Sequence, residues 1–201
     1  MVKRFKLAGL LSALALAVGL GLNGAAGVAQ ADAPTPVPGV YYEVFAPYNA
    51  QSSYQECAEV PSASMTPDSR LQIYHCHSGV GQLWQFFKMP GTDGWDGSSG
   101  GLYWLVNKNS GMCMGLSNSE FYVKQELCNP GDDSQLWGIT PSSIDFNNDG
   151  LFQLFNGDFP ANCLETANVL GGNSTPVEIS DRCDVSSTPD RINESQTWKL
   201  G

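Results

Sequence analysis

A Gln-x-Trp tripeptide that occurs three times constrains the fold of this chain more than any other feature. The copies are Gln82-Leu83-Trp84, Gln135-Leu136-Trp137 and Gln196-Thr197-Trp198, and their glutamines are 53 and 61 residues apart. Such a period indicates one small unit built three times. Residues two apart on a strand share a face, so we expect each Gln and Trp to point together. The Trp would then fill the core while the Gln amide satisfies backbone groups, which predicts a mainly structural motif.

The six cysteines follow the same period. Two precede each Gln-x-Trp copy: Cys57 and Cys76, then Cys113 and Cys128, then Cys163 and Cys183. Six cysteines alone can pair in many ways, but a repeat that carries two in every copy favours one disulfide per copy. Each predicted bridge closes a loop of 15 to 20 residues and stabilises the fold by roughly 3 kcal/mol in the chain-entropy account.

The amino-terminal residues 1–31 have the pattern of a cleaved secretory signal peptide. Lys3, Arg4 and Lys6 precede an apolar run over residues 7–22, and Ala29-Gln30-Ala31 supplies a small-x-small cleavage site. A retained membrane anchor is the alternative, but the run is shorter than the roughly twenty residues that a span needs. We therefore expect a secreted, extracellular protein with no membrane insertion after cleavage. Export also places the cysteines where disulfides persist.

The charge of the chain argues against anionic partners. The formal net charge is −10, and removal of the signal peptide leaves seven basic against twenty acidic residues, a charge of −13. Such a chain repels phosphate backbones and anionic lipid, so nucleic acid is an unfavourable partner. Neutral glycans and cationic proteins remain compatible. Acidity that serves only solubility is the simpler interpretation.

The mature chain reads as one all-β domain behind a short tail. Residues 32–40 form a Pro-rich N-terminal tail, and residues 41–201 form the domain, with repeats at approximately 41–89, 102–140 and 151–201. Each repeat opens on a short strand pattern, at residues 42–45, 102–106 and 151–155, and Gly, Pro, Asn and Asp fill the intervals. These intervals are too short for a long amphipathic helix, which predicts an all-β class.

Three Gln-x-Trp copies, each with a cysteine pair, resemble the ricin B-type lectins and the related carbohydrate-binding modules of bacterial xylanases. The resemblance covers residues 41–201. It implies a β-trefoil with pseudo-three-fold symmetry, in which three hairpins close a six-stranded barrel and each copy has room for one shallow sugar pocket. In that family the pocket combines an acid two residues after the first Cys, an aromatic two before the second, a Gln two before the aromatic, and an Asn-Gln pair. Carboxylate and amides bind sugar hydroxyls while the aromatic stacks on the ring.

The first copy follows this pattern most closely. The resemblance implies a carbohydrate-binding set in which each residue matches a family position: Glu59, Gln72, Tyr74, His77 and Gln82. Two departures weaken it, because Glu59 is longer than the usual Asp and Gly81 replaces the Asn. Each would reduce binding by roughly 1 kcal/mol. Tyr74 as an ordinary half-buried strand residue is the competing interpretation.

The other two copies depart further from the pattern. In the second, Gly115 replaces the acid, Glu126 the aromatic and Ser134 the Asn, so we expect no pocket there. In the third, Glu165 keeps an acid, but Asp181 takes the aromatic place and Ser195 the Asn place. The sequence therefore predicts sugar binding mainly through the first repeat.

Metal and cofactor chemistry has little support in the sequence. His75 and His77 alternate and would face together, but no third ligand is apparent nearby. The stretch from Asp145 to Gly150 begins like a calcium loop, yet Asn156 stands where the bidentate acid belongs, so a plain turn is the better interpretation. No nucleophile elbow, zinc-protease motif or phosphate loop occurs. We expect no metal, no cofactor and no catalytic residues.

Two functions fit these features. The first is a secreted, non-catalytic lectin-like protein that binds neutral galactose- or xylose-type saccharides. The second is a β-trefoil that has lost its sugar sites and binds another protein, such as a glycoprotein, as an inhibitor or accessory subunit would. A small glycosidase, working through two of the twenty acidic residues, is a third class that the sequence alone leaves open.

Overall fold

The structure is a computed structural model of the 201-residue chain. It describes residues 34–46, 55–94, 100–117, 121–141, 150–168, 172–183 and 194–201. The predicted signal peptide and nearly all of the Asp145–Gly150 stretch lie outside these residues. Of the predicted tail, residues 34–40 are described, and they turn at Pro38-Gly39 before the first strand. No helix in the described part of the chain has the length and apolar character that a membrane crossing requires.

Twelve strands form the described part of the domain, four in each copy. The first copy contains β1 (Tyr41–Ala46), β2 (Glu56–Glu59), β3 (Gln72–His75) and β4 (Leu83–Lys88). The second contains β5 (Leu102–Asn107), β6 (Cys113–Leu116), β7 (Val123–Glu126) and β8 (Trp137–Pro141). The third contains β9 (Phe152–Asn156), β10 (Leu164–Thr166), β11 (Thr175–Ile179) and β12 (Lys199–Leu200). Short 3₁₀ turns lie between them: η1 (Pro61–Ala63), η2 (Val80–Gln82) and η4 (Asp133–Gln135).

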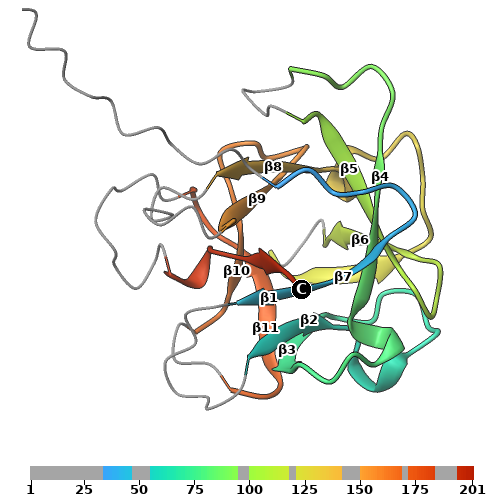
Figure 1. Cartoon of the computed structure of the whole chain (residues 1–201), viewed down its shortest axis with the longest axis vertical. Coiled ribbons are helices and arrows are strands. Elements are labelled where there is room, and N and C mark those ends of the chain that lie inside the picture. Colours follow the sequence, from blue (N-terminus) through green and yellow to red (C-terminus); the bar gives the residue numbers. More distant parts are fainter. Residues whose placement is uncertain are drawn as a thin grey trace, which may run out of the picture.

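Six of these strands close a barrel (Figure 1). Antiparallel pairing runs from β12 to β1, β4, β5, β8 and β9. The ring closes where Phe152 at the start of β9 pairs with Trp198, just before β12, through backbone hydrogen bonds of 2.8 and 2.9 Å. Closure leaves no open sheet edge along these strands.

The remaining six strands form three hairpins that pair with one another beside the barrel. The hairpins are β2–β3, β6–β7 and β10–β11. Strand β11 pairs with β3, and single bridges join Arg70 to Lys124 and Tyr122 to Glu178. Each hairpin therefore contacts both others, which gives the predicted pseudo-three-fold β-trefoil. Because the hairpins meet at shared seams, a residue of one copy can lie at the rim of another copy's surface.

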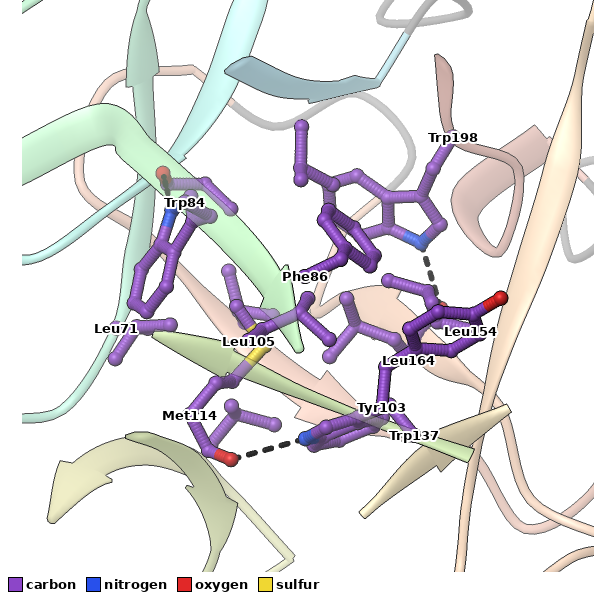
Figure 2. Packing of buried hydrophobic residues seen from close by; sticks show 14 of the residues in the cluster. Leu71, Trp84, Phe86, Tyr103, Leu105, Met114, Trp137, Leu154, Leu164 and Trp198 are labelled. Atoms are coloured by element: carbon purple, nitrogen blue, oxygen red, sulfur yellow. Dashed lines mark hydrogen bonds between the residues drawn. The ribbon is translucent and has the colours of Figure 1, made fainter. Parts of the chain in front are cut away.

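The core lies inside the barrel and under the hairpins (Figure 2). The tryptophans of the three motifs, Trp84, Trp137 and Trp198, are fully buried there among Val, Ile, Leu and Phe side chains. Each indole Nε1–H donates to the carbonyl oxygen of the residue that follows the first cysteine of its copy. The acceptors are Ala58, Met114 and Leu164, at 3.0, 3.0 and 2.9 Å. The motif thus connects each barrel strand to its own hairpin.

The three predicted disulfides are confirmed. Cys57–Cys76, Cys113–Cys128 and Cys163–Cys183 each join the two chain segments at the open end of one hairpin, and no free cysteine remains in the chain. Each disulfide lies within one copy, so it stabilises a single hairpin and does not connect two copies.

Candidate functional site: the first-copy hairpin and its counterparts

The three motif glutamines do not lie on strands, contrary to the prediction. Gln82 and Gln135 end the 3₁₀ turns η2 and η4, one residue or two before the strand that follows. The turn is favoured because it lets the buried amide form hydrogen bonds to the backbone on both sides of the second cysteine of the copy. Gln82 Nε2 donates to His75 O at 2.9 Å, and Gln82 Oε1 accepts from His77 N at 2.9 Å. These are the residues before and after Cys76.

The other copies repeat this arrangement. Gln135 donates to Leu127 O at 3.0 Å and accepts from Asn129 N at 2.8 Å, on either side of Cys128. Gln196 donates to Arg182 O, the residue before Cys183, at 3.0 Å. All three glutamines are at most 1% exposed. Their role is to hold the end of the hairpin in place. Because Gln82 is buried, it supports a binding face by positioning the neighbouring groups and not by direct contact with a ligand.

The outer face of the first hairpin gathers three of the predicted site residues. Strands β2 and β3 pair with Glu59 opposite Gln72 and Cys57 opposite Tyr74. Ala58 and Ile73, which lie between them, belong to the buried core. Because side chains alternate on a strand, Glu59, Gln72 and Tyr74 share the face directed away from the core. Glu59 is buried, whereas Gln72 and Tyr74 are partly exposed.

Gln82 orients the carboxylate of this face. Its Nε2 lies 3.5 Å from Glu59 Oε2, at the long end of a hydrogen bond. The same amide also binds the backbone at His75, so its position is fixed independently of Glu59. The carboxylate is therefore preorganised on a rigid hairpin, with acceptor capacity left for a ligand donor.

Three rings border this face at the end of β3. The Tyr74 ring centroid lies 4.3 Å from that of His75 and 6.0 Å from that of His77, and the two imidazoles are 5.4 Å apart. Gly79 N donates to His77 Nδ1 at 3.1 Å, which places the proton of the neutral imidazole on Nε2. A Cβ at Gly79 would come 2.3 Å from His77 Cε1. The glycine therefore makes room for the ring in the position seen.

The missing Asn at Gly81 has a steric explanation. A Cβ at Gly81 would lie 2.9 Å from Val60 O and 3.2 Å from Ala63 Cα, both backbone atoms at the 3₁₀ turn η1. The buried Gly81 carbonyl instead accepts from Asn107 Nδ2 at 3.0 Å. The turn η1 thus leaves no room for the Asn that the family has at this position. At this position no side chain supplies the hydrogen-bond donor of that Asn.

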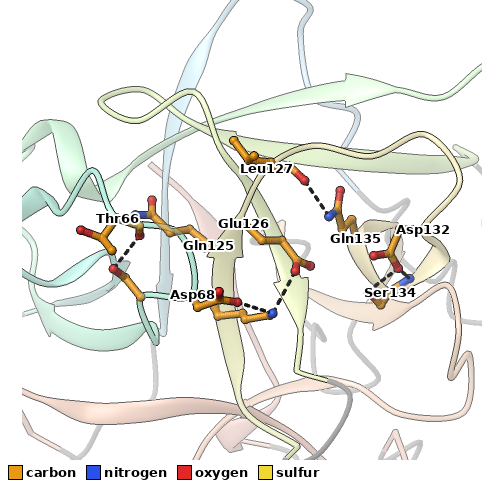
Figure 3. Close-up of polar contacts among 10 residues, drawn as sticks. Thr66, Asp68, Gln125, Glu126, Leu127, Asp132, Ser134 and Gln135 are labelled. Carbon is orange, nitrogen blue, oxygen red and sulfur yellow. Dashed lines mark hydrogen bonds and ion pairs between the residues drawn. The ribbon is translucent and has the colours of Figure 1, made fainter.

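The second copy keeps a carboxylate that sequence reasoning missed. A Cβ at Gly115 would come 2.0 Å from Glu126 Oε1 and 3.2 Å from Gln135 Cγ. The Glu126 side chain on β7 therefore reaches across to the place that Glu59 occupies in the first copy. Lys124 Nζ lies 3.0 Å from Glu126 Oε2 and 2.6 Å from Asp68 Oδ1. Figure 3 shows these ion pairs, which connect the second hairpin to the first-copy loop.

The second copy lacks the amide and the aromatic ring of the first-copy hairpin and has an ion pair in their place. Lys124 and Glu126 lie at the register positions of Gln72 and Tyr74. In the described part of the chain no donor reaches Glu126 Oε1, which is buried. The signal that could have indicated this is a glycine diagonally across from an acid on the paired strand, because Gly115 pairs with Lys124 and Glu126 pairs with Cys113. This signal is readable only once the register is known.

The third copy corrects one prediction. The sequence places Asp181 at the aromatic position, but β10 and β11 pair with Glu165 opposite Glu178, which puts Ser180 opposite Cys163. One extra residue between β11 and Cys183 shifts the count, so Ser180 occupies the place of Tyr74. Ser180 is buried, and its Oγ accepts from Cys163 N at 3.0 Å. The third copy therefore offers no stacking ring.

Glu165 keeps the acidic position of the third copy. Its Oε2 lies 3.3 Å from Gln196 Nε2, as Glu59 does from Gln82. Burial raises the pKa of Glu165 above the ordinary 4.5, the Gln196 hydrogen bond opposes this rise, and the charges of Glu178 and Asp181 add to it. In the third copy Glu165 is paired with a second acid, Glu178, whereas in the first copy Glu59 is paired with the neutral Gln72. The third-copy face is therefore more negative than the first-copy face.

Among the residues that the structure describes, one group of side chains has the spacing of metal ligands, but its chemistry does not suit a metal. Glu43, Cys57 and Cys76 place one oxygen and two sulfurs within 4.8 Å of one another. Both sulfurs belong to one disulfide and cannot act as thiolates. The Glu43 carboxylate accepts from Ser78 N at 2.7 Å and thereby fixes the loop after Cys76.

The fold is a β-trefoil in which each copy contributes one disulfide-bonded hairpin. Residues 81–180 match the sequence profile of the ricin-type beta-trefoil lectin domain-like family. This part of the chain is thus similar to the ricin-type β-trefoil lectin domains. A search of curated proteins found no match to the chain.

Three solved structures illustrate the likeness in fold. The designed three-fold symmetric protein ThreeFoil is 20% identical with a TM-score of 0.59, over 80% of this chain and 96% of its own. A Macrolepiota procera ricin B-like lectin in complex with lactose is 18% identical with a TM-score of 0.54, over 83% and 98%. The exo-β-1,3-galactanase 1,3Gal43A from Clostridium thermocellum is 15% identical with a TM-score of 0.60, over 83% of this chain and 31% of the enzyme. A β-trefoil of this kind therefore occurs both in lectins and within enzymes.

Proposed function

We propose that this protein is a secreted, non-catalytic lectin that binds neutral galactose- or xylose-type saccharides through the first-copy hairpin. The observation that carries the proposal is the shared outer face of Glu59, Gln72 and Tyr74. The face combines a carboxylate, an amide and a ring, and sugar recognition needs these three kinds of group together.

Each group has a distinct task in this proposal. Tyr74 stacks on the C–H face of a pyranose, because its partly exposed ring lies on the outer side of the hairpin. Glu59 accepts hydrogen bonds from ring hydroxyls, and Gln82 keeps its carboxylate in place. Gln72 can both donate to and accept from a neighbouring hydroxyl, and His77 presents its Nε2–H at the exposed rim.

Secretion and the absence of chemistry are parts of the same proposal. Three disulfides suit an oxidising compartment, which agrees with the signal pattern of residues 1–31. The matched region of 1,3Gal43A is less than a third of that enzyme, so the likeness extends to one part of it. We expect oligosaccharides incubated with this protein to stay intact.

Retention on immobilised sugars tests the proposal. Wild type, Tyr74→Ala and Tyr41→Ala would be passed over lactose-agarose and mixed with insoluble xylan. Tyr41 is the control, since it is an exposed tyrosine on β1, 40% exposed, with Lys108 Nζ 5.2 Å from its ring centroid. We expect wild type and Tyr41→Ala to be retained equally, and Tyr74→Ala to fold but elute early. Equal retention of all three would refute the first-copy site.

A protein-binding module is the second candidate, and the second copy favours it. There the register positions of Gln72 and Tyr74 hold Lys124 and Glu126, and these are committed to ion pairs with each other and with Asp68. A surface of this kind suits charged contacts better than neutral sugars. Failure of the wild type to be retained on any saccharide would favour this candidate.

A further inference from the structure

The third copy contributes a side chain to the rim of the first-copy site. Strand β11 pairs with β3, with Thr175 opposite Ile73 and Pro176 opposite Gln72. Continuing this register by two residues brings Asn173 opposite His75. Asn173 is exposed, and it belongs to the connection between β10 and β11 rather than to the first hairpin.

Two contacts fix the Asn173 amide against His75. Asn173 Oδ1 accepts from His75 N at 2.8 Å, and Asn173 Nδ2 lies 3.5 Å from His75 Nδ1. An amide nitrogen carries two N–H groups, so Asn173 retains a donor for another acceptor. The contact places that donor beside the ring that packs against Tyr74.

The turn that carries Asn173 is well secured. Thr175 N donates to Gly172 O at 3.0 Å, and the Thr175 hydroxyl bonds to Gly172 N at 3.1 Å and to Gly172 O at 2.8 Å. Ser174 N also donates to Ile73 O on β3 at 2.9 Å. Asn173 therefore sits on a turn held both internally and against the first hairpin, which is the preorganisation that a binding group needs.

The row of binding groups is longer than one sugar ring. At about 3.3 Å per residue, the stretch of β3 from Gln72 to His75 spans roughly 10 Å, and Asn173 extends it sideways. Glu59 and Gln72 lie at one end with Tyr74 next to them. The His75 ring, 4.3 Å from that of Tyr74, and the Asn173 amide lie beyond. A saccharide stacked on Tyr74 would direct its next unit toward this pair.

We infer that His75 and Asn173 form a second subsite across the seam between copies, so that the site takes an oligosaccharide of at least two sugar units. This inference rests on the proposed function. Tyr74 anchors the first unit. Asn173 Nδ2 donates to a hydroxyl of the second unit, whose ring edge lies against the His75 imidazole.

Calorimetric titration separates the two subsites. Wild type, Asn173→Ala and Asn173→Asp would be titrated with galactose and lactose and with xylose and xylobiose. Asn173→Asp retains the acceptor for His75 N but loses the amide donor, so it keeps the turn docked. Asn129→Ala is the matched control, an exposed asparagine of the second copy whose Oδ1 accepts from Gly131 N at 3.1 Å.

We expect wild type to bind one of the disaccharides about five- to tenfold more tightly than its monosaccharide, the effect of one or two hydrogen bonds. Both Asn173 variants should lose this advantage and keep monosaccharide binding, while Asn129→Ala keeps both. The inference is overturned if Tyr74-dependent binding persists but the Asn173 variants retain the advantage, or if wild type shows none. If wild type binds none of the four sugars, the proposed function itself fails.

Discussion

The Glu126 side chain occupies the space above Gly115, where a Cβ would lie 2.0 Å from Glu126 Oε1. In the first and third copies the residue at the Gly115 position is itself an acid, Glu59 or Glu165, and it approaches the motif glutamine. The second copy thus receives its carboxylate from the opposite strand of the hairpin. The glycine is required by this arrangement, because any side chain there would compete with Glu126.

We predict that Gly115→Ala destabilises the protein by about 1–2 kcal/mol, the usual cost of overpacking. The new methyl group must displace Glu126 from its ion pair with Lys124 and press on Gln135 Cγ, which lies 3.2 Å away. Guanidinium denaturation measures the change. Gly131→Ala is the control, since the nearest atom to its Cβ is 3.7 Å away. In a Glu126→Ala background Gly115→Ala should cost much less, and an equal cost in both backgrounds would contradict the mechanism.

A second prediction concerns Gly79, whose missing side chain accommodates His77. Gly79→Ala puts a methyl group 2.3 Å from His77 Cε1, so the imidazole must rotate away. Because His77 is an exposed, flexible side chain, stability should change little while saccharide retention falls several-fold. Gly131, three residues after Cys128 as Gly79 is after Cys76, supplies the matched Ala variant. Unchanged retention by Gly79→Ala would remove His77 from the site.

A third prediction tests the structural role of the motif glutamines. Gln135→Ala removes the buried amide that pairs with Leu127 O and Asn129 N, and leaves both backbone groups without this partner. We expect a loss of about 2–4 kcal/mol in the free energy of unfolding. Gln85→Ala on β4, where the side chain is partly exposed, should cost less than about 0.5 kcal/mol. Similar costs for the two variants would mean that the hydrogen bonds on both sides of Cys128 are dispensable.

The fourth prediction follows from the raised pKa of Glu165. Burial is the main cause, and the nearby Glu178 and Asp181 charges add to it against the Gln196 hydrogen bond. The folded state therefore holds this proton more tightly than the unfolded chain. The stability that Glu165 contributes is present below pH 4.5 and is lost as pH rises through the folded-state pKa.

Replacement of Glu165 by Gln should therefore raise the melting temperature at pH 7. The advantage over wild type should shrink as the pH falls and disappear below about pH 4, where both forms are uncharged. Melting curves of the two proteins between pH 3 and 8 measure this difference. A difference that stays constant across the range would show that packing, not charge, distinguishes the variants.

Much of the fold could be predicted because its signals are local. The spacing of the Gln-x-Trp copies and the two cysteines in each predicted the three-fold repeat, the disulfides and the β-trefoil. Each of these depends on contacts within one hairpin or between a hairpin and its own barrel strand, such as the bond from Trp84 to Ala58. Because such contacts are repeated in every copy, the residues that make them recur at regular intervals in the sequence.

The parts that escaped prediction depend on register and on contacts between copies. The shift that replaces Asp181 by Ser180 requires knowledge of how β10 and β11 pair. The reach of Glu126 over Gly115 depends on the pairing of β6 and β7. Asn173 lies 98 residues from His75, and no local pattern indicates that they meet. In the second copy, counting from the cysteines gave the residue types correctly but not their contacts, and in the third copy it gave Asp181 where the register places Ser180.

The pairing of Phe152 with Trp198 has a consequence for how the protein is made. The barrel ring closes through residues near the carboxyl end of the chain, and β12 also pairs with β1 near the other end. During synthesis the nascent polypeptide cannot complete its barrel until Trp198 and β12 have left the ribosome. A barrel that closes only after β12 has been made therefore forms late in the folding of the chain.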